Sequence, residues 1–340
     1  MSLVSTFTYF KSLYEDLLRN KTALSTFTTP DHKEIDMIPM ISSLCYGPLG
    51  ACQLPRTWWK VLLRKANLMD EEYPDFSGGL DRGVFEALNL DQDTTLTYLR
   101  DNMPSYLDFE AWILKQKGDA FFGFEQQDAI IRWNAKLRAR RHNRPEKIQE
   151  TYNDIGLPSN AGIDSAIVLN SLQDWQLFFK RDLNSGYATK LGGRVVPLVA
   201  TIDYGPLGVR QLPRTWYKIA LKAKRLLHPD YPDMTGGGLD PRALKALNLD
   251  IDKTLSFIRT SMPSYLDFEA WVLAQNNGKL PGGAVDEWND YLCNRIHNDS
   301  KREDIHATID RKHDDSLKSA IILNQIEDWH LAHQDLINNL

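Results

Sequence analysis

Apolar residues recur at helical spacing along most of this chain, which predicts a mainly helical protein. In LPRTWWKVLLRKANL, residues 54–68, a proline stands at the usual first helical position, and Trp58, Leu62 and Ala66 fall on one face. Further helices are expected in LDRGVFEALNL, DQDTTLTYLR and MPSYLDFEAW, around Trp133 and Trp175, and in the matching stretches of the second half. The pattern predicts an all-α fold class.

Two stretches favour extended chain instead of helix. They are IPMISSLCY, residues 38–46, and VVPLVATIDY, residues 195–204, which are rich in apolar and β-branched residues. Their prolines indicate edge or irregular segments, because proline cannot donate a hydrogen bond within a sheet. We therefore expect at most short extended segments.

Polar residues at the predicted helix starts indicate where the helices begin. Asp81 and Asp240 open two short helices and are expected to be their N-caps. Ser105 and Asp108 form a Ser-x-x-Asp capping pattern before the apolar run of MPSYLDFEAW.

The predicted elements occur twice because the sequence repeats itself. Copy 1, Tyr46–Gln116, and copy 2, Tyr204–Gln275, are identical at more than half of their positions after one extra glycine in copy 2 is allowed. Similarity continues upstream into the extended stretches and downstream beyond a Trp-Asn pair. Each repeat is about 150 residues long, which is the size of a whole domain. We expect two homologous, pseudo-two-fold-related helical domains, residues 1–180 and 181–340.

Composition and charge narrow the classes of partner. The chain has 340 residues, of which 42% are hydrophobic and 25% charged, enough apolar material for two ordinary domains. A net charge of -5 gives no global attraction to nucleic acid or to an anionic membrane. The basic stretch IIRWNAKLRARRHNRPEK, residues 130–147, is the one candidate nucleic-acid footprint, but its aromatic residues are too few for base stacking. We expect no nucleic-acid or membrane partner.

Several absences in the sequence shape the remaining expectations. Charges interrupt every apolar run and the first residues do not resemble a signal peptide, so a cytoplasmic location is expected. The cysteines are Cys45, Cys52 and Cys293, and copy 2 has Asp203 and Arg210 opposite the first two. We therefore expect neither a structural disulfide nor a metal site, and no sequence motif indicates a cofactor.

The order of these motifs resembles a bacterial family of small domains of unknown function, number 5069. In copy 1 the matching positions are Leu49, Gly50, Leu54, Pro55, Arg56, Lys60, Tyr73, Gly79, Asp81, Asp91, Ser105, Glu110, Trp112, Trp133 and Asn134. In copy 2 they are Leu207, Gly208, Leu212, Pro213, Arg214, Lys218, Asp230, Tyr231, Gly238, Asp240, Asp250, Ser264, Glu269, Trp271, Trp288 and Asn289. The family usually has one domain, and a second glycine where Ala51 and Val209 stand. The resemblance implies the fold and the domain count, and it implies no activity.

The best candidate for binding chemistry is a cationic helix start. Arg56 and Lys60 share one face of the helix that follows the Gly-Pro-Leu-Gly turn, where free backbone N-H groups also favour an anion. The candidate ligand-binding residues are Arg56, Lys60 and Gln53 with their counterparts Arg214, Lys218 and Gln211. The alternative interpretation is structural: the arginine pairs with a carboxylate such as Asp81 or Asp108, and the lysines form a solvated stripe.

Candidate proton-transfer groups surround this helix start. Tyr46, Tyr204, Asp81 and Asp240 are the first candidates for proton chemistry, although capping also explains the aspartates. His142 and His297 are the histidines matched between the copies, and closing a helix also explains them.

One further stretch supports a ligand site, because MPSYLDFEAW occurs unchanged in both copies. Capping and core packing account for its serine and apolar residues but not for Tyr106 and Tyr265, which are added to the ligand-binding candidates. Recent duplication would explain the same identity.

Two hypotheses follow for the function. The first is a protein that binds a small anionic metabolite at the repeated YGPLG-LPR pocket, with or without catalysis by its Arg, Tyr and Asp residues. The second is a non-catalytic protein-interaction scaffold. They differ in where the shared residues point: into a cavity for the first, and onto a contiguous surface patch for the second.

Overall fold

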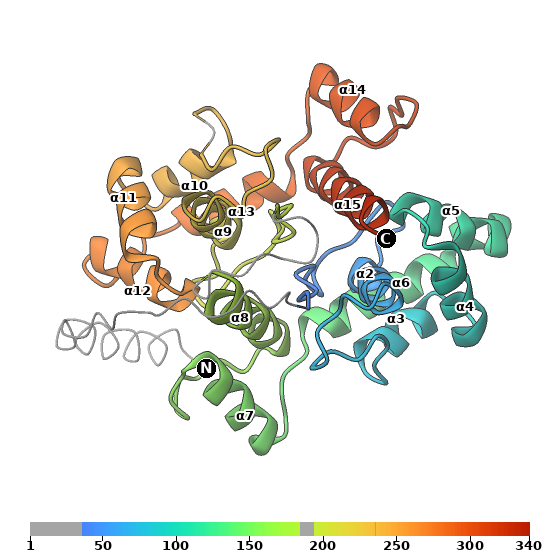
Figure 1. Cartoon of the computed structure of the whole chain (residues 1–340), viewed down its shortest axis with the longest axis horizontal. Coiled ribbons are helices and arrows are strands. Elements are labelled where there is room, and N and C mark those ends of the chain that lie inside the picture. Colours follow the sequence, from blue (N-terminus) through green and yellow to red (C-terminus); the bar gives the residue numbers. More distant parts are fainter. Residues whose placement is uncertain (1–35, 184–193, 235) are drawn as a thin grey trace. The chain divides into compact units, whose positions relative to one another are not determined.

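The computed structural model describes residues 36–183, 194–234 and 236–340, and within them the chain is helical (Figure 1). Pairing of extended segments is limited there to isolated bridges, one of which joins Met37 to Met69. The stretches 38–46 and 195–204 form no strand. The prediction of an all-α fold is confirmed. No helix of the described part is long and apolar enough to cross a membrane.

The helices follow the repeat in the sequence. Up to residue 183 they are α2 (Leu54–Lys65), α3 (Leu80–Ala87), α4 (Gln92–Asn102), α5 (Tyr106–Lys117), the 3-10 turn η1 (Gly118–Phe122), α6 (Phe124–Arg138), α7 (Pro145–Ile155), α8 (Ala166–Phe178) and the π-helical turn η2 (Phe179–Leu183). The second half contains α9 (Leu212–Ala223), α10 (Leu239–Ala246), α11 (Ile251–Ser261), α12 (Tyr265–Gln275), α13 (Ala284–Cys293), α14 (Asp299–Thr308) and α15 (Ala320–Asn338). Helices α7 and α14 were not predicted. Helix α14 has few apolar residues, but α7 carries Ile148, Tyr152 and Ile155 at helical spacing.

The chain forms two compact units, and each unit draws on both repeats. The copy-1 unit contains residues 36–140, 194–203 and 292–340, and the copy-2 unit contains residues 141–183 and 204–291 without residue 235. The expected domains, in contrast, divide the chain in order at residue 180. Helices α7 and α8 belong to the unit of copy 2, whereas α14 and α15 belong to the unit of copy 1.

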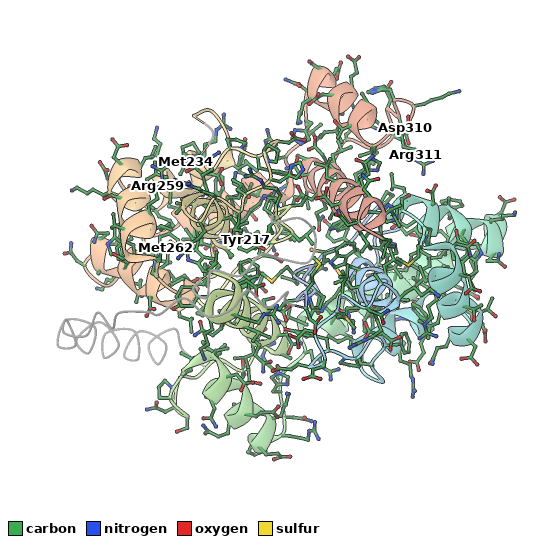
Figure 2. All side chains as sticks on the ribbon, in the orientation of Figure 1. Tyr217, Met234, Arg259, Met262, Asp310 and Arg311 are labelled. Carbon is green, nitrogen blue, oxygen red and sulfur yellow. The ribbon has the colours of Figure 1, made fainter. Side chains whose placement is uncertain are left out.

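In the copy-1 unit, α15 packs against the repeated helices α2 and α5. The rings of Trp329 and Tyr106 meet edge to face with their centroids 4.6 Å apart, and the ring centroids of His333 and Trp58 are 6.1 Å apart. Arg311, labelled in Figure 2, donates to Asp108 at the start of α5. The apolar face of α15 is therefore buried against copy 1, although α15 follows copy 2 in the sequence.

In the copy-2 unit, α8 occupies the matching place. The rings of Trp175 and Tyr265 meet edge to face with their centroids 4.8 Å apart, and the ring centroids of Phe178 and Tyr217 are 5.0 Å apart. Tyr217 is fully buried and is labelled in Figure 2. Each unit is thus completed by the last helices of the other repeat.

One predicted helix cap is found in the structure, and two others are not. Ser105 caps α5 as predicted, because its Oγ accepts from the Asp108 N-H at 3.3 Å. The prediction that Asp81 and Asp240 are N-caps is wrong. Gly79 and Gly238 occupy the N-cap positions. Both aspartates stand within the first turn, where their buried side chains bond to lysines of α2 and α9.

Candidate functional site

The residues expected to form the anion pocket of copy 1 converge on Asp81. Asp81 Oδ2 lies 2.6 Å from Lys60 Nζ, and both side chains are buried. The Asp81 carboxylate also accepts from Thr57 Oγ1 at 2.6 Å, Gln53 Nε2 at 2.8 Å and the Ser77 N-H at 2.8 Å. Acid and base therefore neutralise each other inside the unit.

Burial acts on the two charges of this pair in different ways. For Asp81, burial alone would raise the pKa, but Lys60 and the hydrogen bonds outweigh it and the pKa is lowered. For Lys60, burial lowers the pKa and Asp81 offsets only part of the effect. The pair ties α2 to α3 and holds the start of α3 in place.

Copy 2 repeats this cluster with its own residues. Lys218 Nζ lies 2.6 Å from Asp240 Oδ2, and Asp240 also accepts from Thr215 Oγ1 and Gln211 Nε2, each at 2.8 Å. The four side chains are buried. The repeated Gln, Thr and Lys of the LPR helix thus all serve one buried carboxylate.

Arg56 is also buried, and its partners differ from those considered in the sequence. Its guanidinium donates to the carbonyls of Pro39 and Ile41 at 2.6 and 2.7 Å, and it lies 5.9 Å from the ring centre of Tyr73. The stretch 38–46 pairs into no strand, so its carbonyls need other donors. Arg214 is likewise buried and lies 5.8 Å from the ring of Tyr231.

The Tyr-Gly-Pro-Leu-Gly turn packs against the tyrosine and the glutamate of α5. A Cβ atom on Gly47 would lie 2.3 Å from the Tyr106 ring and 2.6 Å from Glu110 Oε1, so no larger residue fits there. Tyr106 donates to Glu110 Oε1 at 2.6 Å, and the Leu49 N-H donates to the same carboxyl at 3.3 Å. Gly50, with a φ of 75°, closes the turn in the left-handed region that favours glycine.

Copy 2 has the same arrangement around Glu269. Tyr265 donates to Glu269 Oε1 at 2.6 Å, and Gly205 makes the same close approach to the tyrosine. Burial raises the pKa of Glu110 and of Glu269 to about 8 in each case, although the hydrogen bonds act in the opposite direction. These contacts give Tyr106 and Tyr265 the packing role that the sequence did not reveal.

The other proton-transfer candidates have different contacts. The Tyr46 carbonyl accepts from Gln325 of α15 at 3.3 Å, and the ring of Tyr204 lies 5.6 Å from the Arg210 guanidinium. His297 Nε2 lies 2.7 Å from Asn324 Oδ1, and burial lowers the pKa of this histidine. The His142 N-H donates to the Asp164 carbonyl before α8 at 3.1 Å. Both matched histidines therefore lie where a chain segment meets the start of α8 or α15.

The described residues contain no group of three or more His, Cys, Asp or Glu side chains placed to hold a metal ion. Cys45 and Cys52 are buried free thiols, and Cys293 is an exposed one. Burial and the nearby Asp203 carboxylate raise the pKa of Cys45, which disfavours its reactive thiolate form.

Two surface features were not anticipated from the sequence. Phe122 of η1, and Phe124 and Ile131 of α6, are exposed by 69%, 84% and 66%. In the copy-2 unit, a surface groove of about 670 Å³ is lined by residues that include Gly236, Gly237, Arg242, Lys245 and Asp252. The signal for the first feature was present as FFGF, in a segment that is four residues shorter in copy 2 and has no phenylalanine there.

The chain was compared with protein-family models, with curated proteins and with solved structures. It matches no family model, no curated protein and no solved structure. The resemblance to the bacterial family of domains of unknown function stays a prediction.

Proposed function

We propose that this protein is a cytoplasmic, non-catalytic protein-interaction scaffold. The supporting observation is a division of roles among its residues. The polar side chains of the repeated LPR segment and their aspartate partners are buried within each unit, whereas strongly exposed apolar side chains gather between Phe122 and Ile131, where copy 2 has a shorter and different sequence. The shared residues build the framework, and the copy-specific surface makes the contact.

The buried residues support the framework role. Lys60 and Asp81 neutralise each other at 2.6 Å, and Arg56 is held by two backbone carbonyls. A ligand carboxylate or phosphate at this helix start would have to displace these partners. Such an exchange leaves a buried group unpaired, which costs several kcal/mol.

The exposed segment supports the contact role. Single exposed apolar residues are ordinary on protein surfaces, but three large ones within ten residues form a patch of the kind that binds other proteins. Phe122 and Phe124 are exposed by more than two thirds, and aromatic residues are enriched at the centre of such interfaces.

Site-specific photocrosslinking in cells tests this proposal. A photoreactive phenylalanine at Phe124 should crosslink to one protein of defined mass, and the adduct should disappear when Ile131→Asp is added. The same probe at Ile296, an isoleucine that is 62% exposed outside this segment, is the control. Equal labelling of many proteins from both positions, or no adduct from Phe124, would refute the proposal.

A second candidate function, binding of a small anionic molecule, is supported by the groove of the copy-2 unit. Arg242 and Lys245 are exposed at its rim, and the open backbone of Gly236 and Gly237 has no atom that would meet an added Cβ within 4 Å. Asp250 of the groove is already engaged as the N-cap of α11. Asp252 is the other carboxylate of the lining, so an anion would bind beside Arg242 and Lys245.

A thermal-shift screen against anionic metabolites tests this second candidate. A ligand should raise the melting temperature of the wild type and of Lys253→Gln, an exposed lysine outside the groove lining, but not of Lys245→Gln. If every stabilising anion acts equally on the three proteins, the groove is not its site.

A further inference from the structure

The exposed apolar residues of copy 1 form a stripe along α6. Phe124 and Ile131 are seven residues apart, two helical turns, so they lie on one face. Ala135 extends the stripe and is exposed as well. The opposite face carries Trp133 and Leu137, which are buried in the copy-1 unit. The helix therefore has an apolar face on each side, and only one is covered by the unit.

The fold of the repeat does not require this second apolar face. Trp133 Nε1 donates to the Cys52 carbonyl at 2.9 Å, and Trp288 makes the matching bond to the Arg210 carbonyl at 2.9 Å. In copy 2, Asp286 stands two residues before the tryptophan, where copy 1 has Ile131. Helix α13 also begins four residues before its tryptophan, whereas α6 begins nine residues before. Copy 2 thus builds the same core contact without the stripe.

The charges beside the stripe have opposite signs at the two ends of the helix. Glu125 lies at its exposed start and Lys136 near its exposed end, on the same flank because eleven residues are three helical turns. Between them, Asp128 and Arg132 pair within the helix at 2.9 Å. A partner of one charge sign would match only one end of this surface. A second α6 running antiparallel matches both ends.

We propose, on the basis of the scaffold function above, that this face of α6 binds a second copy of the same chain. The two α6 helices pack antiparallel about a two-fold axis near Ile131. Each Glu125 then faces the turn that carries Lys136 of the partner subunit, and the two helix dipoles oppose each other. Such a self-complementary patch gives a closed, two-fold dimer.

The size of the patch sets the strength of the dimer. The exposed parts of Phe122, Phe124 and Ile131 amount to roughly 400 Å² in each subunit. This is below the roughly 800 Å² per partner of a stable, specific interface. The dimer therefore forms reversibly and depends on concentration.

Sedimentation velocity on the purified full chain, from about 5 to 300 μM, tests this proposal in the weak-interface range. The wild type should shift from monomer towards dimer as its concentration rises. Ile131→Asp, which installs the residue of copy 2, should stay monomeric, and Ala135→Glu should do the same. Ile296→Asp removes an equally exposed isoleucine outside the stripe and should dimerise like the wild type.

Charge exchange tests the antiparallel arrangement. Glu125→Lys and Lys136→Glu should each weaken the dimer about threefold to tenfold at low salt, because each appears twice across a two-fold interface. The combined variant should recover the wild-type affinity. If the combined variant is as weak as either single variant, the antiparallel register is refuted.

The outcomes separate this inference from the scaffold function. A wild type that stays monomeric over the whole range overturns the homodimer, and so does a dimer that survives Ile131→Asp. If Phe124 nevertheless crosslinks to a different protein in cells, the scaffold function stands without self-association. A crosslinked product with twice the mass of the chain supports both.

Discussion

The buried carboxyl of Glu110 should make the stability of the copy-1 unit depend on pH. Its pKa is raised from the ordinary 4.5 to about 8, because burial disfavours the carboxylate. Folding therefore favours the protonated form. The stabilising contribution is fully present below pH 4.5 and is lost as the pH rises through 8. A pKa shift of this size lowers the free energy of unfolding by roughly 4 kcal/mol between pH 5 and pH 8.5.

Glu110→Gln isolates this contribution, since glutamine has the shape of the protonated acid and can still accept from Tyr106 or Leu49. The variant should resemble the wild type at pH 5 and exceed its free energy of unfolding by roughly 4 kcal/mol at pH 8.5. Urea unfolding followed by circular dichroism at both pH values measures the difference. Glu269→Gln should act in the same way on the copy-2 unit.

Other groups also titrate in this range, but the comparison removes them. Burial lowers the pKa of His297, His330 and His333, so these residues favour folding more as the pH rises through their folded-state pKa values towards 6.5. Wild type and variant share them, and the subtraction cancels their effect. Glu86→Gln, at an exposed glutamate on α3, is the matched control. A wild-type-to-Glu110→Gln difference that stays constant within about 1 kcal/mol from pH 5 to pH 8.5 would refute the reasoning.

Three further substitutions test the framework, each measured by chemical denaturation. Gly47→Ala should destabilise by roughly 2–3 kcal/mol because its Cβ meets an aromatic ring, while Gly78→Ala, whose nearest atoms lie 4.0 Å away, should stay within about 1 kcal/mol of wild type. Trp329→Ala should cost the copy-1 unit roughly 3–5 kcal/mol, and an unchanged unfolding midpoint would contradict the packing of α15 on copy 1. Lys60→Met should cost roughly 3–5 kcal/mol by leaving a buried carboxylate unpaired, and adding Asp81→Asn should recover part of the loss.

Local features of the fold could be predicted because neighbouring residues determine them. The proline at the start of α2 and the Ser105 cap of α5 both act within one turn of helix, and the sequence indicates both. The role of Asp81 could not be predicted in this way. An aspartate near a helix start looks like a cap, and only the position of Lys60 on another helix shows that it is an ion-pair partner.

The partners of Arg56 also depend on contacts between distant segments. The sequence indicated both a candidate anion-binding arginine and an extended stretch with proline, but not that they meet. The carbonyls of Pro39 and Ile41 are the acceptors, so the arginine replaces the donors that a neighbouring strand would supply. The expected partner was an anion, either on a ligand or on a carboxylate such as Asp81 or Asp108, because opposite charges attract.

The origin of α8 and α15 in each unit could not be predicted for a different reason. The two copies present nearly the same surface to these helices. Trp329 packs edge to face against Tyr106, and Trp175 packs in the same way against Tyr265. Amphipathic spacing shows that such a helix needs a partner face, but it cannot distinguish two equivalent faces. Which copy each of these helices packs against is therefore decided by the fold of the whole chain and cannot be read from one repeat.

Divergence between the copies shows that they are no longer interchangeable. Ser42 donates to Asp203 Oδ1 at 2.5 Å, and both side chains are buried in the copy-1 unit. These residues come from the two matching extended stretches, in which Ala200 stands opposite Ser42 and Cys45 stands opposite Asp203. Two identical stretches would lack either the hydroxyl donor or the carboxylate acceptor, so this bond requires the copies to differ. The repeated YGPLG-LPR segments therefore preserve the buried framework of each unit, while the differences between the copies provide the Ser42–Asp203 bond of the copy-1 unit and the α6 surface.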